Sequence, residues 1–133
     1  MVVWIGHQIF EKQNAQTIVN GEVEDVHEFS LSKNIMLVPL LSGAGIRVKI
    51  LEAMAMGKTI IATAVAAEGI GVTNKLNIFL ADDAESFVER IKYCIKHPTL
   101  ALEVGKRARE FVTEFYQKEK IYKELVEGIK HLI

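Results

Sequence analysis

Five short runs of β-forming, mostly apolar residues limit what this chain can fold into more than any other feature. Each run is bounded by Gly, Asn, Pro or Asp, and the runs fall at residues 2–5, 17–19, 35–38, 59–62 and 78–80. Continuous apolar runs of this length are typical of strands that are buried on both faces, as in a parallel sheet covered by helices. The runs therefore predict a parallel sheet.

Helical patterns lie between these runs and after them. A short pattern covers residues 25–32, and a stronger one covers residues 45–56, where apolar side chains recur near helical spacing. Gly57 follows the stronger pattern and is the residue type that most often ends a helix. Residues 64–77 form the longest segment without clear periodicity, so we expect a functional loop there.

After Leu80 the pattern is entirely helical. One helix is predicted from a cap at Asp82 or Asp83 to about residue 97, a second from Pro98, and a third over about residues 117–132. The apolar residues expected on their inner faces are Phe87, Val88, Ile91, Cys94 and Ile95, then Leu102, Ala108, Phe111, Val112 and Phe115, then Ile121, Leu125, Ile129 and Leu132. The whole pattern predicts an α/β fold: a Rossmann-like parallel sheet flanked by helices, with the terminal helices packed on it.

Length and charge narrow the class of protein. The 133 residues are half hydrophobic, a quarter are charged and the net charge is −1, which suits one domain over residues 1–133. No basic field predicts a nucleic-acid partner, and no apolar run reaches the roughly 18 residues of a transmembrane helix. The only cysteine, Cys94, is expected in the core. Residues 1–10 lack the features of a signal peptide, so a cytoplasmic location is predicted.

The segment from Leu37 to Gly57 carries the candidate site. A strand leads into a loop containing Gly43 and Gly45, and a helix follows. The glycines allow the backbone to approach a ligand closely, and the start of the helix offers free N–H groups that attract anions. Arg47 lies in the first helical turn, where a cation is unfavourable unless an anion lies nearby. Because ligands of open α/β sheets bind beyond the carboxyl ends of strands, this segment predicts a phosphate site.

Glu52 lies five residues after Arg47, which is about 7.5 Å further along a helix axis. A carboxylate at that distance could accept hydrogen bonds from two neighbouring ribose hydroxyls. Lys49 stands three residues before Glu52, so an ion pair on one helix face is the alternative. The spacing alone leaves both interpretations open.

Several segments in order resemble one known family. They are residues 41–58, LSGAGIRVKILEAMAMGK, followed by IIAT at 60–63 and AAEGI at 66–70, and preceded by VNGEVEDV at 19–26 and IMLVPL at 35–40. This succession resembles the C-terminal domain of GT-B retaining glycosyltransferases of the glycosyl transferases group 1 type. The resemblance covers roughly residues 17–125.

The resemblance implies transfer of a sugar from a nucleotide diphosphate sugar to a glycan or a lipid-linked acceptor. It implies no metal and no cofactor besides the donor substrate. Glu52 would be the second glutamate of the family's E-x7-E motif, which binds the ribose, and Ala44 replaces the first. Glu68 would edge the donor cleft, with a turn carboxylate or helix cap as the alternative. The donor-binding residues implied are Gly43, Ala44, Gly45, Ile46, Arg47, Glu52 and Glu68.

The resemblance also implies missing parts. The N-terminal acceptor domain of such enzymes has no counterpart here, so we expect a truncated donor-binding domain that is inactive alone. The alternative is a non-catalytic Rossmann-like module that binds a partner or a small phosphorylated metabolite. A second copy of the chain is a further candidate partner, because an exposed sheet edge invites pairing. Peripheral contact with the inner membrane face is a hypothesis that rests on Lys106, Arg107, Arg109, Lys118, Lys120 and Lys123.

Overall fold

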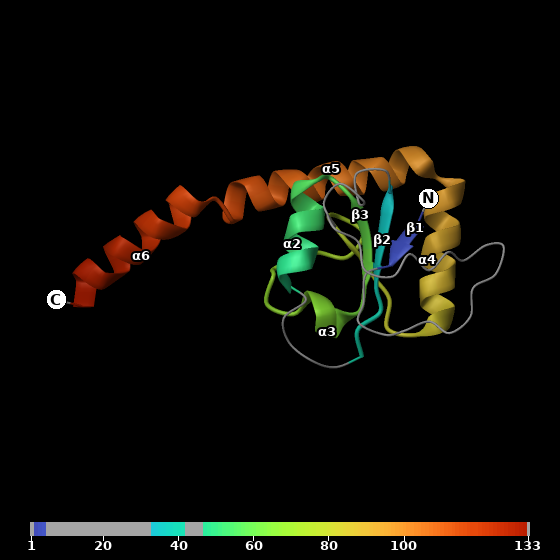
Figure 1. Cartoon of the computed structure of the whole chain (residues 1–133), viewed down its shortest axis with the longest axis horizontal. Coiled ribbons are helices and arrows are strands. Elements are labelled where there is room, and N and C mark those ends of the chain that lie inside the picture. The colour runs from blue at the N-terminus through green and yellow to red at the C-terminus, as the bar shows by residue number, and fades with distance from the viewer. Residues whose placement is uncertain (1, 5–32, 42–46, 133) are drawn as a thin grey trace, which may run out of the picture.

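The computed structural model describes residues 2–4, 33–41 and 47–132 of the chain (Figure 1). Four strands lie side by side in chain order: β1 (Val2–Trp4), β2 (Ile35–Val38), β3 (Thr59–Ala62) and β4 (Phe79–Leu80). All three pairings are parallel. This confirms the predicted α/β fold with a parallel sheet, and β3 is buried along its whole length, as its apolar run predicts.

The strand expected at residues 17–19 and the helix expected at residues 25–32 lie outside the described residues. The helix predicted over residues 45–56 is present as α2 (Arg47–Ala55) in the described part. Gly57 adopts a φ of 71° and donates its N–H to the Met54 carbonyl, at 2.9 Å. The Lys58 N–H donates to the Ala53 carbonyl at 3.0 Å. This pair of bonds is a Schellman ending, which confirms the role predicted for Gly57.

The segment expected as a loop over residues 64–77 departs from that expectation. It begins with a four-residue helix, α3 (Ala64–Ala67), and Asn74 later forms an isolated parallel bridge with Ile78. Thr63 caps α3, because its hydroxyl accepts the Ala66 N–H at 3.2 Å. A single turn of small residues is too short to show helical periodicity, which is why the sequence did not reveal it.

Helices cover both faces of the sheet. On one face, β2 and β3 direct Met36, Val38, Ile60 and Ala62 against α2, α3 and the later part of α5 (Pro98–Phe115). The opposite face buries Ile35, Ile61 and Phe79 under α4 (Ala84–Lys96) and the start of α5. Successive residues of a strand point to opposite faces, so each strand contributes to both cores.

The inner face of α4 is narrower than predicted. Phe87 and Cys94 are buried and Ile91 is half-buried, but Val88 and Ile95 are exposed. On α5, Leu102 and Phe115 are also exposed, against the expectation. Val88, Ile95 and Leu102 each directly follow a buried residue in the sequence, which places them about 100° away from it around the helix, and Phe115 is the last residue of α5. A helix lying on a sheet therefore buries one stripe and leaves its apolar neighbours in solvent.

α5 crosses the end of the sheet and joins the two cores. Near its start, the Thr59 hydroxyl at the beginning of β3 donates to the Ala101 carbonyl at 2.7 Å. Just after its end, the Tyr116 hydroxyl donates to the Ile70 carbonyl at 2.7 Å. Figure 1 shows α5 running from α4 on one side of the sheet to α2 on the other. These two bonds fix α5 across the strands.

The last helix, α6 (Lys118–Leu132), corrects one part of the predicted fold. It contains no buried residue and projects away from the sheet, past the end of α5 (Figure 1). The sequence predicted that the terminal helices pack on the sheet; α4 and α5 do so, and α6 does not. None of the described helices is long and apolar enough to cross a bilayer.

Candidate functional site

The carboxyl ends of β2 and β3 lie at the same edge of the sheet. The two strands are parallel neighbours, with Val38 paired to Ala62 at their ends. α2 follows β2 and α3 follows β3, and the two helices contact each other. Figure 1 shows the start of α2 and the whole of α3 at this edge. The chain therefore brings two of its predicted ligand-binding segments to one place, which we call the carboxyl edge.

The residues predicted from sequence are only partly described. Gly43, Ala44, Gly45 and Ile46 lie outside the described residues, and Arg47 is the first residue of α2. Glu52 and Glu68 both lie within the described residues.

Glu52 is exposed on the outer side of α2. The side chains that α2 buries against the sheet are those of Ile50, Ala53 and Met54. Glu52 stands on the opposite side, so its carboxylate is open to solvent rather than enclosed by apolar packing. The position is compatible with a ligand beside α2.

Glu68 is exposed at the end of α3. It is the C-cap residue of that helix, and its N–H donates to the Val65 carbonyl at 3.4 Å. Because α3 follows β3 directly, Glu68 stands on the carboxyl edge near the helix that Arg47 begins. The structure thus brings the segments of Arg47 and Glu68 together, with Glu52 further along α2.

Two polar residues that the sequence did not assign to this site, Thr63 and Asp82, hold this edge together. The Thr63 hydroxyl donates to the Leu40 carbonyl at 2.5 Å and so ties the end of β3 to the segment after β2. The Asp82 carboxylate accepts the Ala64 N–H at 2.9 Å and ties the segment after β4 to α3. A threonine before a helix is a recognised cap signal, so Thr63 could have been found from the sequence. The role of Asp82 depends on a contact across 18 residues and could not.

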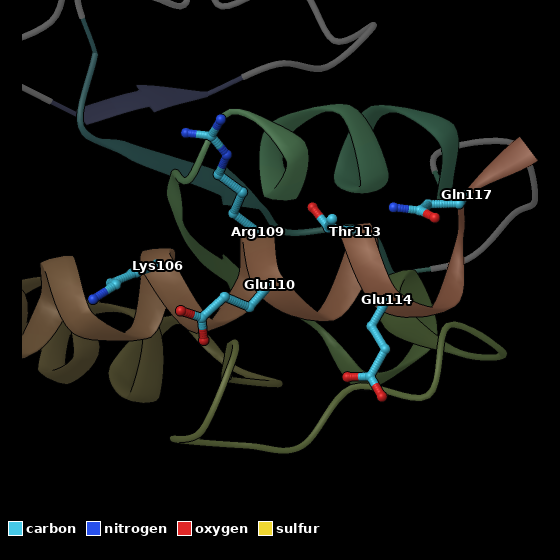
Figure 2. Close-up of a pocket in the computed structure, with 6 residues that line it drawn as sticks. All are labelled: Lys106, Arg109, Glu110, Thr113, Glu114 and Gln117. Carbon is cyan, nitrogen blue, oxygen red and sulfur yellow. The ribbon is translucent and has the colours of Figure 1, made fainter.

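A shallow pocket of about 650 Å³ lies elsewhere, on the outer side of α5. It is lined by Lys106, Arg109, Glu110, Thr113, Glu114 and Gln117. Arg109 extends from α5 toward the C-terminal end of α2 (Figure 2). Two cations and two carboxylates balance in this lining, and none of the residues predicted for the site belongs to it. The pocket offers no net charge for an anionic donor.

The buried Cys94 and the half-buried Lys58 both have pKa values shifted by burial. Burial raises the pKa of the Cys94 thiol, with Arg90 acting weakly in the opposite direction, so the thiol stays protonated near neutral pH. Burial lowers the pKa of Lys58, whose ammonium donates to the Lys33 carbonyl at 2.5 Å. Cys94 therefore behaves as the core residue that its sequence context predicts. Within residues 2–4, 33–41 and 47–132, no group of three or more His, Cys, Asp or Glu could hold a metal ion.

The sequence model of one family, glycosyl transferases group 1, matches residues 3–97. The chain belongs to this family. The match includes every residue predicted for donor binding and ends as α5 begins. The resemblance stated from sequence motifs is thereby confirmed.

The fold of this chain matches the fold of solved C-terminal domains of GT-B glycosyltransferases. A C-terminal domain of a glycosyl transferase group 1 family protein from Francisella tularensis matches with a TM-score of 0.66 and 20% identity, over 74% of this chain and 52% of that one. Anabaena HepE, solved in complex with UDP, matches with a TM-score of 0.72 and 19% identity, over 82% and 30%. Sucrose-phosphate synthase from Thermosynechococcus elongatus matches with a TM-score of 0.64 and 27% identity, over 75% and 25%.

Two curated relatives are much longer than this chain. Trehalose synthase from Pyrococcus horikoshii is 30% identical over 96 residues, which are 71% of this chain and 23% of the relative. An uncharacterized 44.6 kDa protein in the cps region of Klebsiella pneumoniae is 25% identical over 114 residues, or 86% of this chain and 29% of the relative. The chain thus spans less than a third of either relative.

Proposed function

We propose that this chain binds the nucleotide diphosphate sugar donor of a glycosyltransferase whose acceptor is a glycan or a lipid-linked sugar. Family membership supports the transferase chemistry. HepE, which shares the fold, was solved with UDP, and this supports a nucleotide as the ligand class here as well. Neither a metal nor a further cofactor enters the proposal.

The proposal assigns chemistry to the start and the middle of α2 and to the end of α3. The first N–H groups of α2 and the charge of Arg47 bind the diphosphate, because a helix start and a cation both attract phosphate. Glu52 binds the ribose hydroxyls, and Glu68 edges the sugar. The observation that carries the proposal is the exposure of Glu52 on a helix that begins just beyond the carboxyl end of β2.

We also propose that the chain alone transfers no sugar. Catalysis needs groups positioned on both sides of the reacting carbon, and the residues assigned here all belong to the donor side. The chain spans 29% and 23% of its curated relatives, and in this proposal the residues that bind the acceptor are not among the 133 residues. A turnover assay with donor and acceptor should give no product, and product formation by this chain would overturn this part.

Calorimetric titration with UDP and GDP tests the donor site. We expect one of the two nucleotides to bind and to raise the Tm. Hydrogen bonds to a charged group are worth about 1.5–3 kcal/mol, so Glu52→Gln should weaken binding by roughly 10- to 100-fold. Arg47→Gln should also weaken it. Glu89→Gln, an exposed glutamate on α4, is the matched control and should bind as the parent does.

Two results would contradict the proposal. If Glu52→Gln and Glu89→Gln bind the nucleotide equally well, the carboxylate of Glu52 has no part in the site, and pairing with Lys49 becomes the better account of it. If neither nucleotide binds the folded chain, the non-catalytic binding module becomes the better description.

A further inference from the structure

The loop that carries Glu68 receives a contact from a distant part of the chain. Residues 68–71, Glu-Gly-Ile-Gly, follow the single turn of α3, and we call them the Glu68 loop. Gly69 and Gly71 adopt φ values of 81° and 87°, a region that glycine enters without steric strain. A helix of four residues has few internal hydrogen bonds to keep it rigid, and glycine has the widest backbone freedom of any residue. The position of Glu68 is therefore set largely by contacts from outside the loop.

Tyr116, at the end of α5, makes such a contact. Its hydroxyl donates to the Ile70 carbonyl at 2.7 Å, across 46 residues of sequence. Its own N–H donates to the Val112 carbonyl at 2.9 Å, so α5 holds the backbone of Tyr116. Ile70 is buried and donates its N–H to the Ala67 carbonyl at 3.3 Å. Ile70 thus ties the Glu68 loop to α3 through its N–H and to α5 through its carbonyl.

The aromatic ring of Tyr116 is also held in place. The rings of Phe111 and Tyr116 both pack against the core on one face of the sheet, and their centroids lie 6.1 Å apart. A Cβ built on Gly71 would lie 3.6 Å from the Cζ atom of Phe111, so α5 also lies against the far end of the Glu68 loop. The end of α5 therefore connects the packed core to this loop.

We propose that Tyr116 is a positioning residue for donor binding, which holds Glu68 beside the sugar of the nucleotide diphosphate sugar. The inference rests on the proposed function, in which Glu68 edges the sugar. Glu68 precedes Ile70 by two residues, so their Cα atoms are at most about 7 Å apart. A hydrogen bond this close to Glu68 restricts where its carboxylate can lie. Without the bond, the sugar has to order the loop as it binds, and ordering a loop on binding lowers affinity.

The effect of Tyr116 should be confined to the sugar. Arg47 and Glu52, which the proposed function assigns to the diphosphate and the ribose, belong to the segment after β2. The Tyr116 hydroxyl is bonded to the segment after β3 instead. Binding of a nucleoside diphosphate without a sugar should therefore not depend on this hydroxyl. The net contribution of one neutral hydrogen bond limits the weakening of sugar nucleotide binding to about threefold to tenfold.

Hydrogen exchange of the 133-residue chain tests the contact without any ligand. Tyr116→Phe keeps the ring and its packing and removes only the hydroxyl. We expect the amides of the Glu68 loop to exchange several-fold faster in this variant, while the strands keep their protection. Tyr122→Phe is the matched control, because Tyr122 is a tyrosine on α6 that is 69% exposed. Unchanged exchange of the loop in Tyr116→Phe would overturn the proposal.

Calorimetric titration tests the positioning role, with whichever of UDP and GDP binds and with the same diphosphate carrying glucose. Tyr116→Phe should weaken the glucose compound about threefold to tenfold and leave the nucleoside diphosphate unchanged. The double variant Glu68→Ala, Tyr116→Phe should bind the glucose compound no more weakly than Glu68→Ala alone, because Tyr116 acts through Glu68. A role in stability alone would not produce this pattern.

The possible failures are distinguishable. If the parent binds neither UDP nor GDP, the proposed function fails and the positioning role fails with it. If the parent binds and Tyr116→Phe binds the glucose compound equally well, the donor site stands and only the role of Tyr116 is overturned. Losses from Glu68→Ala and Tyr116→Phe that add together would also overturn it, because they would show that Tyr116 acts independently of Glu68.

Discussion

Gly105 of α5 lies directly against the backbone of Gly57, in the turn between α2 and β3. A Cβ at this position would lie 2.3 Å from the carbonyl oxygen of Gly57, which is backbone and cannot rotate away. Gly57 itself has a φ of 71° as the residue that ends α2. The contact of these two glycines lets α5 lie against the turn between α2 and β3. A helix interior usually avoids glycine, so the close approach explains why Gly105 stands there.

Gly105→Ala should destabilise the protein even though alanine favours helix. The added methyl forces α5 away from the Gly57 carbonyl, and overpacking of this kind costs about 1–3 kcal/mol. Urea unfolding measures the loss. Gly128→Ala is the control and should not destabilise the chain, because a Cβ at Gly128 would meet no atom within 4 Å. Equal stability of Gly105→Ala and the parent would show that α5 is free to shift.

At the scale of elements, the ends of the helices are set by local contacts. α4 begins at a capping box in which the Asp83 carboxylate accepts the Ser86 N–H at 2.7 Å and the Ser86 hydroxyl oxygen accepts the Asp83 N–H at 3.3 Å. The hydrogen bonds from Ser86, the backbone one first, lower the pKa of the Asp83 carboxyl. The sequence predicted a cap at Asp82 or Asp83, and the structure selects Asp83.

The Asp83 cap should give α4 a pH dependence. Because the folded pKa lies below the ordinary value, the stabilisation is complete above that ordinary value and is lost as the pH falls through the lowered pKa. Asp83→Ala should therefore lower the Tm at pH 7, and the difference from the parent should shrink in acid. Asp83→Asn keeps an acceptor for the cap and should stay closer to the parent at pH 7.

Thermal unfolding of the three proteins between neutral and acidic pH makes this comparison. A Tm difference between Asp83→Ala and the parent that is constant across the whole range would mean that the ionised carboxylate contributes nothing to the cap.

At the scale of the whole molecule, the chain divides at the end of α5. Tyr116 is the last residue with a hydrogen bond back to the loop after α3, through the Ile70 carbonyl. α6 follows and buries nothing. We therefore expect the free energy of unfolding to depend on the sheet and the helices packed on it, and hardly on α6.

Removal of residues 118–133 should leave the sheet intact. No core residue is lost, so the Tm should change by no more than about 2 °C, as expected for changes away from buried contacts. Far-ultraviolet circular dichroism should report the loss of one helix. A fall in Tm of roughly 10 °C or more would mean that α6 supports the sheet.

Of the candidate site, the sequence predicted the helix on which Arg47 and Glu52 lie and the strand that precedes it. The exposure of Glu52 and the nearness of α3 to α2 came from the structure, because both depend on how separate segments pack. The donor-binding roles themselves stay predictions. Thr63 and Asp82 show the limit of sequence reasoning, since their hydrogen bonds at this edge join segments that follow different strands.

The sequence by itself determined the parallel strands, the three terminal helices and the ending at Gly57, because apolar runs, helical spacing and caps act over a few residues. Tertiary structure alone decided which apolar residues are buried. Val88, Ile95 and Leu102 are as hydrophobic as the buried residues beside them, but a helix on a sheet covers one stripe only. Tertiary structure also decided that α6 projects from the sheet, because α5 runs across the strands from α4 to α2 and α6 continues past its end.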